Sequence, residues 1–185
     1  MNKIIVEVSI GELLDKISIL EIKKGKIKDS EKLKFINNEH SILKDQLDRN
    51  VKSDDKLNDL FKSLKNINSK LWIIEDDKRQ CEKEKDFGEK FINLSRDVHF
   101  LNDDRAKIKL EINNHTGSVI KEINNKLWVI EDDKRQCEKD KDFGEKFIKL
   151  SRDVHFLNDD RAKIKLEINN HTGSVIKEIK EYTSY

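Results

Sequence analysis

The sequence predicts an all-α fold: an elongated antiparallel helical bundle of coiled-coil-like hairpins with a tandem duplicated segment. Three observations predict it. The 185 residues contain no proline, the residue that most often interrupts a helix. Apolar side chains recur at alternating spacings of three and four residues, as they do on one face of a helix. A long segment with this pattern also occurs twice in succession.

The duplicated segment covers residues 67–122 and recurs as residues 123–178. Only four positions differ between the copies: Ser69/Asn125, Ile73/Val129, Glu84/Asp140 and Asn93/Lys149. Such near-identity indicates a recent tandem duplication, natural or engineered, and not an old repeat. The chain then divides into N-terminal helices with the start of a long helix (1–66), a helical hairpin (67–122), its second copy (123–178) and a tail (179–185).

Two helices are expected before the duplicated segment. Ser9 and Glu12 fit a capping box, in which the hydroxyl accepts from the Glu12 amide and the Glu12 carboxylate reaches back. One face of the first helix then carries Leu13, Ile17, Leu20 and Ile27, with Lys24 in the remaining position. Asp29 or Ser30 can cap the second helix. Its apolar face contains Leu33, Ile36, His40, Leu43 and Leu47, and His40 is expected to be a core histidine with satisfied hydrogen bonds.

The third helix is expected from about residue 54 to residue 85. Its spacing alternates between three and four throughout, which is typical of a coiled-coil seam: Leu57, Leu60, Leu64, Ile67, Leu71, Ile74, Lys78 and Cys81. A tight turn should follow at Asp86–Gly88, with Gly88 supplying the free backbone dihedrals and Phe87 closing the hairpin.

The fourth helix shows the same spacing in Phe91, Leu94, Val98, Leu101, Arg105, Ile108 and Ile112. Matching seams joined by a short turn predict antiparallel packing. The second copy repeats the pattern, with a helix to about residue 141, a turn at 142–144 and a helix to about residue 170.

The junction between the copies allows two structures. Gly117 can end the fourth helix and Ser118 can cap the next, which would give two hairpins side by side. The apolar pattern also continues through this point, so that one helix of about 55 residues and roughly 80 Å could run from Gly88 to Asp142 and form a rod. A glycine inside a helix costs only about 1 kcal/mol, so the sequence leaves both open.

Composition excludes several classes of partner. Lys and Arg number 38 and Asp and Glu 37, and the charges are interleaved, so we expect no nucleic-acid and no membrane partner. No apolar run approaches the ~20 residues of a membrane span, and Glu7 interrupts the only short one near the N-terminus. Cys81 and Cys137 are the same repeat position, which is no disulfide framework and favours a reducing cytoplasm. The kind of interaction left to expect is a protein partner or self-association through the helix seams.

The individual motifs favour structural roles, so the sequence predicts no enzyme activity and no catalytic, cofactor-binding or metal-binding residues. The Asp-Phe-Gly turns resemble a kinase magnesium motif, but the other kinase motifs are missing. His99 and Asp103, four residues apart, are the best metal-ligand pair, although a surface ion pair is the simpler interpretation. His115 and Asp104 add no ligand spacing, and Cys81 is expected to be a small core residue.

The stretch from Arg96 to Arg105 is the densest in charged and polar groups. The simpler interpretation is a polar network that fixes helix register, with Arg105 opposite Glu75, Asp76 and Asp77 of the preceding helix. The other interpretation is a site for an anion or a sugar phosphate, formed by Arg96 and Arg105 and by their copies Arg152 and Arg161.

Several motifs resemble an uncharacterised bacterial family of small helical proteins, classed as a domain of unknown function. The resemblance spans the single-copy chain and lies in residues 7–17, 20–23, 71–72, 74–76, 87, 91–92, 102–103, 105–106 and 172–174. It implies no catalytic residues. Members neighbour glycosyltransferases, which implies a loose association with cell-surface glycan assembly, and the second copy departs from the family pattern.

Two functions follow from these observations. The first is a non-enzymatic helical scaffold or protein-interaction module, or a chain that carries the duplication by design. The alternative is a small anionic-ligand or partner-binding protein associated with cell-surface glycan assembly.

Overall fold

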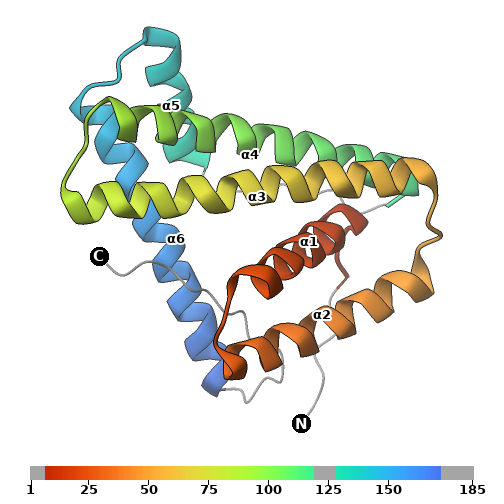
Figure 1. Ribbon diagram of the computed structural model, residues 1–185. Helices are drawn as coiled ribbons and strands as arrows, with labels where there is room; N and C mark the ends of the chain where they lie inside the picture. Colours follow the sequence, from red (N-terminus) through yellow and green to blue (C-terminus); the bar gives the residue numbers. More distant parts are fainter. Residues whose placement is uncertain (1–6, 119–127, 172–185) are drawn as a thin grey trace.

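A computed structural model describes residues 7–118 and 128–171, and these residues form six helices and no strand (Figure 1). The all-α helical bundle predicted from the sequence is confirmed. The helices are α1 (Ile10–Lys26), α2 (Ser30–Asn50), α3 (Asp55–Glu84), α4 (Glu89–Thr116), α5 (Trp128–Asp140) and α6 (Glu145–His171). None of these described helices is both long and apolar enough to cross a membrane.

Both predicted N-caps are present, and a third helix is capped as well. Ser9 Oγ accepts from the Glu12 amide at 3.2 Å, and Asp29 rather than Ser30 caps α2 by accepting from Glu31 and Lys32. Asp54 caps α3 through the Leu57 amide at 2.8 Å. The second half of the predicted capping box is wrong, because the Glu12 carboxylate accepts from Lys109 Nζ of α4 instead of reaching back to its own helix.

Helices α3 and α4 form the predicted antiparallel hairpin, but Gly88 does not supply its unusual backbone. The left-handed residue is Lys85, with φ 58°, whereas Gly88 has φ −74°. Asp86 Oδ1 accepts from the Gly88 amide at 3.0 Å, and the Phe87 ring packs edge-on against Phe91 at 5.4 Å. Lys141 takes the same role in the second copy, with φ 53°.

The fourth helix ends at Gly117, so the continuous rod is wrong. Gly117 has φ 68°, a conformation that glycine adopts without steric cost. Its amide and that of Ser118 both donate to the Asn113 carbonyl, which satisfies a helix-end acceptor as in a C-terminal cap. Residues 119–127, through which the longer helix would have continued, and the predicted tail lie outside the described residues.

The main core lies between α1, α2, α3 and α4. Its buried residues are Leu14, Ile17, Leu47, Leu57, Leu64 and Ile112, and a second cluster joins Leu20, Ile27 and Ile36. Most come from the predicted apolar faces, whereas Lys24 is exposed and the neighbouring Lys23 is buried. One four-helix unit therefore contains both clusters.

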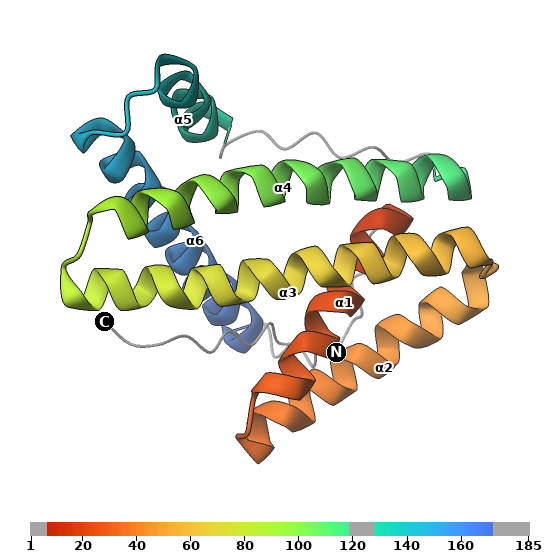
Figure 2. The same cartoon turned by 45° about the horizontal axis from the view of Figure 1, so that its top comes forward.

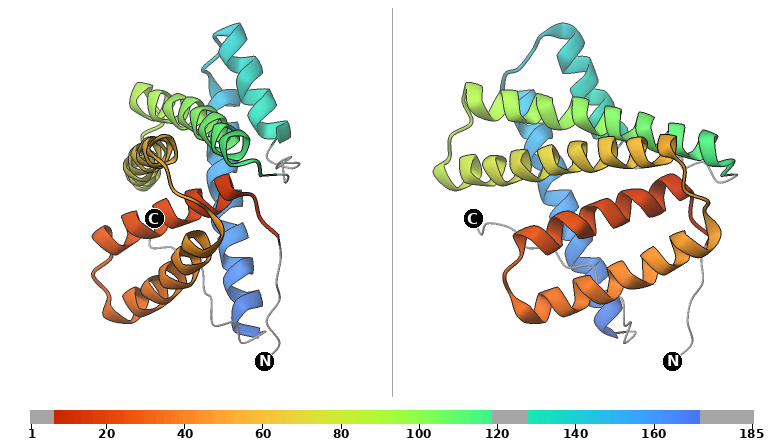
Figure 3. Two further views of the ribbon diagram at one scale, coloured as in Figure 1. Left: turned by 90° about the vertical axis from the view of Figure 1, so that its right-hand side faces the viewer. Right: turned by 45° about the vertical axis from the view of Figure 1, so that its right-hand side comes forward.

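The second hairpin, α5–α6, lies on one side of this four-helix unit (Figures 2 and 3). Helix α6 crosses α3 and α4 instead of running parallel to them, and α5 lies on the side of α4 that faces away from α3. The start of α6 lies near the turn between α3 and α4. The two copies therefore meet near their turns, and they do not stack as parallel hairpins.

Candidate functional site

A buried carboxylate on α1 joins three helices. Asp15 is 2% exposed, and Arg105 of α4 donates to both of its oxygens, from Nε at 2.8 Å and from Nη2. Asn68 of α3 donates to Asp15 Oδ1 at 2.8 Å and to Ser18 Oγ at 2.7 Å. The Ser18 hydroxyl in turn donates to the Asp15 carbonyl. A bidentate ion pair of this kind fixes the positions of the Asp15 carboxylate and the Arg105 guanidinium.

Helix α1 approaches α4 closely beside this network because residue 11 has no side chain. A Cβ on Gly11 would lie 2.6 Å from the Lys109 carbonyl oxygen and 2.9 Å from Asn113 Oδ1. The Gly11 amide donates to that same Asn113 oxygen at 2.7 Å. Together with the Lys109–Glu12 pair, these contacts position the first turn of α1 against the end of α4.

A polar cavity of about 270 Å³ lies beside the network, between α1 and α6. It is lined by Glu12, Asp15, Lys16, Ile19, Leu20, Lys23, Glu39, Arg105, Asn158, Ala162 and Lys165. The buried Glu39 of α2 pairs with Lys16 at 2.8 Å, so part of this charge is already balanced within the protein. The cavity falls just below the size range of typical small-molecule sites, about 300–1,000 Å³.

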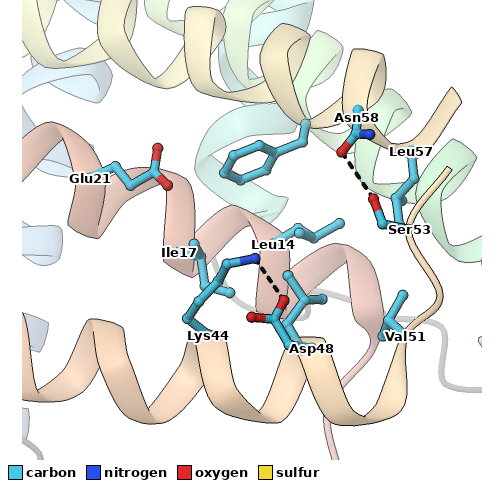
Figure 4. Close-up of a pocket in the computed structure, with 11 residues that line it drawn as sticks. Leu14, Ile17, Glu21, Lys44, Asp48, Val51, Ser53, Leu57 and Asn58 are labelled. Carbon is cyan, nitrogen blue, oxygen red and sulfur yellow. Dashed lines mark hydrogen bonds and ion pairs between the residues drawn. The ribbon is translucent and has the colours of Figure 1, made fainter. Parts of the chain in front are cut away.

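A second cavity, of about 90 Å³, lies between α1, α2 and α3 (Figure 4). Leu14, Ile17 and Leu57 form its apolar wall, and the Lys44–Asp48 ion pair stands at its edge at 2.7 Å. Its volume is far below that of typical small-molecule sites, so it is a packing gap in the core rather than a ligand site.

The contact between the two copies is built from charges and aromatic rings. Arg96 of α4 donates to both Glu138 oxygens of α5, at 2.7 and 3.1 Å, and its guanidinium lies 4.5 Å from the Phe143 ring centre. The same contact occurs in the other direction: Arg152 of α6 donates to Glu82 of α3 at 2.6 and 3.3 Å and lies 4.5 Å from Phe87.

A second pair of contacts is also reciprocal. Arg135 of α5 bonds Asp103 at 3.0 Å, and Arg79 of α3 lies 3.8 Å from Asp159. We call these ten residues the tip interface: Arg79, Glu82, Phe87, Arg96 and Asp103, with Arg135, Glu138, Phe143, Arg152 and Asp159. The hydrogen bonds that Arg96 and Arg152 donate to Glu138 and Glu82, respectively, raise the pKa of each arginine.

The structure separates the arginines that were expected to share a ligand site. Arg96 is held by Glu138 in the tip interface, whereas Arg105 is held by Asp15 in the α1 network. Arg105 was expected to lie opposite the acidic residues of α3, whereas the carboxylate that it bonds in the α1 network, Asp15, lies on α1. Arg152 binds Glu82, and the side chain of Arg161 lies outside the described residues.

His40, His99 and His115 occupy three different environments. His99 is buried rather than on the surface, 3.8 Å from Asp103. His115 Nε2 lies 2.8 Å from Asp54 Oδ2 and joins the end of α4 to the start of α3. The pKa of Asp54 lies below its ordinary value, because the Leu57 amide and then His115 bond its carboxylate. His40 is only half-buried, and its Nε2 is 3.7 Å from Glu21.

No three His, Cys, Asp or Glu side chains are grouped like metal ligands within 7–118 and 128–171. Cys81 and Cys137 are buried free thiols, and burial raises the pKa of each. Desolvation favours the neutral thiol over the reactive thiolate, which fits the predicted role of Cys81 as a small core residue.

The two copies differ in how much of their apolar face is covered. Ile112 of α4 is 0% exposed in the core, whereas its equivalent in α6, Ile168, is 54% exposed. Ile108 packs against the same core, and its equivalent Ile164 is 56% exposed. The first copy packs against α1 through this face. The duplicated segment brings no second α1 and α2, so the second copy leaves the face largely in water.

Sequence reasoning missed Asp15 and Asn68, because their partners are about fifty or more residues away in the chain. One signal was available. Gly11, Asp15 and Ser18 follow four-then-three spacing beside the apolar face of α1, so they form a small and polar stripe along one side of the helix. Such a stripe indicates a close helix contact with polar groups in it.

The fold and these contacts define an all-α protein of antiparallel hairpins whose densest charged residues serve contacts between helices. Residues 4–122 match the family of unknown function DUF6165, and the chain belongs to this family. The resemblance to an uncharacterised family is thereby confirmed. The match ends where the first copy ends, so the second copy lies outside it. No curated protein and no solved structure shows a significant match.

Proposed function

We propose that this protein is a non-enzymatic, cytoplasmic helical interaction module, and that its second hairpin presents an apolar helix face to a helical partner. The observation that carries the proposal is the difference between the copies. One sequence has its face buried in the first copy and exposed in the second. Exposed apolar residues gathered on one face of a helix are a common feature of interaction surfaces.

The exposed face of α6 consists of Leu157, Ile164 and Ile168, which follow spacings of seven and four and so share one side of the helix. The structure also contains the natural complement of this face. In the first copy, Ile108 and Ile112 pack against the cluster that includes Leu14 and Ile17 of α1. A partner with the apolar stripe of α1 fits the second copy by the same side-chain packing.

Two further observations support the class of function and the compartment. Arg96, Asp103 and Arg105, from the densest charged stretch, all bond side chains on other helices, which is the use an architectural protein makes of them. Cys81 and Cys137 are free thiols, as is usual in a reducing compartment.

A binding measurement tests the proposal. A fluorescent peptide of residues 7–28, which contains α1, is titrated with the full chain and followed by anisotropy. We expect saturable binding that weakens at least about tenfold in Ile164→Asp plus Ile168→Asp, since a charge in an apolar contact is poorly tolerated. Ile73→Asp, at an equally exposed isoleucine of α3, is the matched control and should bind normally. No binding, or equal binding by all three proteins, would refute the proposal.

The alternative function, binding of a small anionic ligand in cell-surface glycan assembly, is favoured by one observation. The cavity between α1 and α6 contains Lys16, Lys23, Arg105 and Lys165. An anion there would have to compete with Asp15 for Arg105. A thermal-shift screen with nucleotide sugars separates the two functions: a shift that Arg105→Ala plus Arg161→Ala abolishes would support the alternative.

A further inference from the structure

The tip interface is symmetric in its chemistry. The charged and ring contacts that define the tip interface are repeated by the equivalent residues in the opposite direction. Arg96 with Glu138 matches Arg152 with Glu82, because both partners shift by one repeat length of 56 residues. The Arg135–Asp103 and Arg79–Asp159 pairs obey the same relation.

The geometry of the two halves also agrees. The leading Nε–Oε1 distances are 2.7 and 2.6 Å, and both guanidinium groups lie 4.5 Å from the partner ring. The Phe87–Phe91 and Phe143–Phe147 contacts are identical at 5.4 Å and 87°. Two identical surfaces can meet head to tail, which leaves half of the contacts unused, or about a two-fold axis, which makes every contact twice. The tip interface is of the second kind.

The composition of the interface suits association between proteins. Arginine and aromatic residues are enriched in such contacts, and planar guanidinium groups stack well on rings while they hold carboxylates with two hydrogen bonds. Glu82 is almost completely buried, at 4% side-chain exposure, so its charge depends on the arginine that covers it. None of the four positions that differ between the copies belongs to the interface.

We propose that the tip of the α3–α4 hairpin, formed by Arg79, Glu82, Phe87, Arg96 and Asp103, is a self-association surface whose fitting partner is the same surface of a second copy. In this chain the second repeat supplies that copy from within the molecule. A chain with a single repeat presents the same tip and forms a symmetric dimer through it. This inference does not depend on the proposed function, which concerns the exposed apolar residues of α6 and none of the ten residues of the tip interface.

The rest of the four-helix unit leaves the tip accessible. Helix α1 bonds the other half of the hairpin, through Asn68 of α3 and through Arg105 and Asn113 of α4. The four-helix unit also has its own core and corresponds to the range matched by the family. A chain that lacks residues 123–178 therefore retains the core of α1 to α4 and the hydrogen bonds from α1 to α3 and α4.

The first experiment measures the mass of this shortened chain by light scattering during gel filtration. We expect twice the monomer mass, and the monomer mass for Arg96→Glu, which places like charges opposite each other in both halves. The dissociation constant should rise by about a hundredfold or more. Combining Arg96→Glu with Glu82→Arg exchanges the charges and should restore the dimer. Asp59→Arg, in an exposed pair of α3 outside the tip, is the matched control and should remain dimeric.

A shortened chain that is helical by circular dichroism but stays monomeric would overturn the proposal, as would a dimer that Arg96→Glu leaves intact. The full-length chain provides a second, independent measurement. There, Glu138→Arg plus Arg152→Glu releases the second tip. First tips can then pair with first tips, and charge-exchanged second tips with second tips, so the mass should rise to at least twice that of the monomer. Adding Glu82→Arg and Arg96→Glu should return the monomer. Unchanged mass in both variants would also overturn the proposal.

Discussion

Removing the carboxylate of Asp15 should be among the most damaging single changes in this protein. Asp15→Ala leaves Arg105 without its two-pronged partner and removes one acceptor from Asn68. Breaking a buried ion pair by removing one member costs about 3–5 kcal/mol. The Arg105 side chain is 28% exposed, so water solvates part of its charge once Asp15 is removed. We therefore expect the free energy of unfolding to fall by about 2–4 kcal/mol.

The loss can be measured by urea unfolding followed by circular dichroism. At a slope of about 2 kcal/mol per molar urea, the midpoint should fall by about 1–2 M. Asp48→Ala is the control, because Asp48 forms an exposed pair with Lys44 whose loss should cost under about 0.5 kcal/mol.

A double-mutant cycle then tests whether the pair itself causes the loss. Arg105→Ala should also destabilise the protein, but the double variant should lose clearly less than the sum of the two single losses, with a coupling of about 1.5 kcal/mol or more. Equal midpoints for Asp15→Ala and Asp48→Ala would refute the reasoning. Additive losses within about 0.5 kcal/mol would show that Asp15 and Arg105 do not act as a pair.

Three further predictions follow from the packing and can be checked with the same unfolding assay or a thiol assay. Gly11→Ala should lower the free energy of unfolding by about 1–3 kcal/mol, because the new Cβ meets the backbone of α4. Gly25→Ala, where a Cβ has open space, should raise it by about 0.5–1 kcal/mol. Equal effects of the two changes would contradict the close approach of α1 to α4. Ile112→Ala should cost about 2–5 kcal/mol and Ile168→Ala under about 1 kcal/mol, although both are the same repeat position; similar losses would refute the difference in burial. Cys81 in the folded protein should react with a disulfide reagent at pH 8 far more slowly than in urea, since burial raises the pKa of its thiol and lowers the thiolate fraction; equal rates would be the contrary result.

The sequence predicted the helices because the signals that start and end them are local. Ser9, Asp29 and Asp54 each cap amides two or three residues ahead, so neighbouring residues alone contain the information. The turn was placed correctly but assigned to the wrong residue. Glycine at position 88 suggested the left-handed backbone, whereas Lys85 adopts it directly after α3.

The end of α4 could not be predicted, because a glycine inside a helix costs about as much as a good C-cap contributes. Two amides that bond the Asn113 carbonyl decide the outcome. The Asp15–Arg105 pair was missed for a different reason. Its members are ninety residues apart, and the acidic residues of α3 offered Arg105 a nearer partner in the sequence.

The duplication shows directly that burial is a property of the fold and not of the sequence alone. Residues 67–122 and 123–178 have almost the same amino acids, yet Ile112 belongs to the core and Ile168 is half in water. What distinguishes them is α1, which precedes the first copy and covers its apolar face. The charged and aromatic contacts of the tip interface join the second hairpin to the four-helix unit. Those contacts need only another hairpin of the same sequence, and for that reason they can form within one chain or between two.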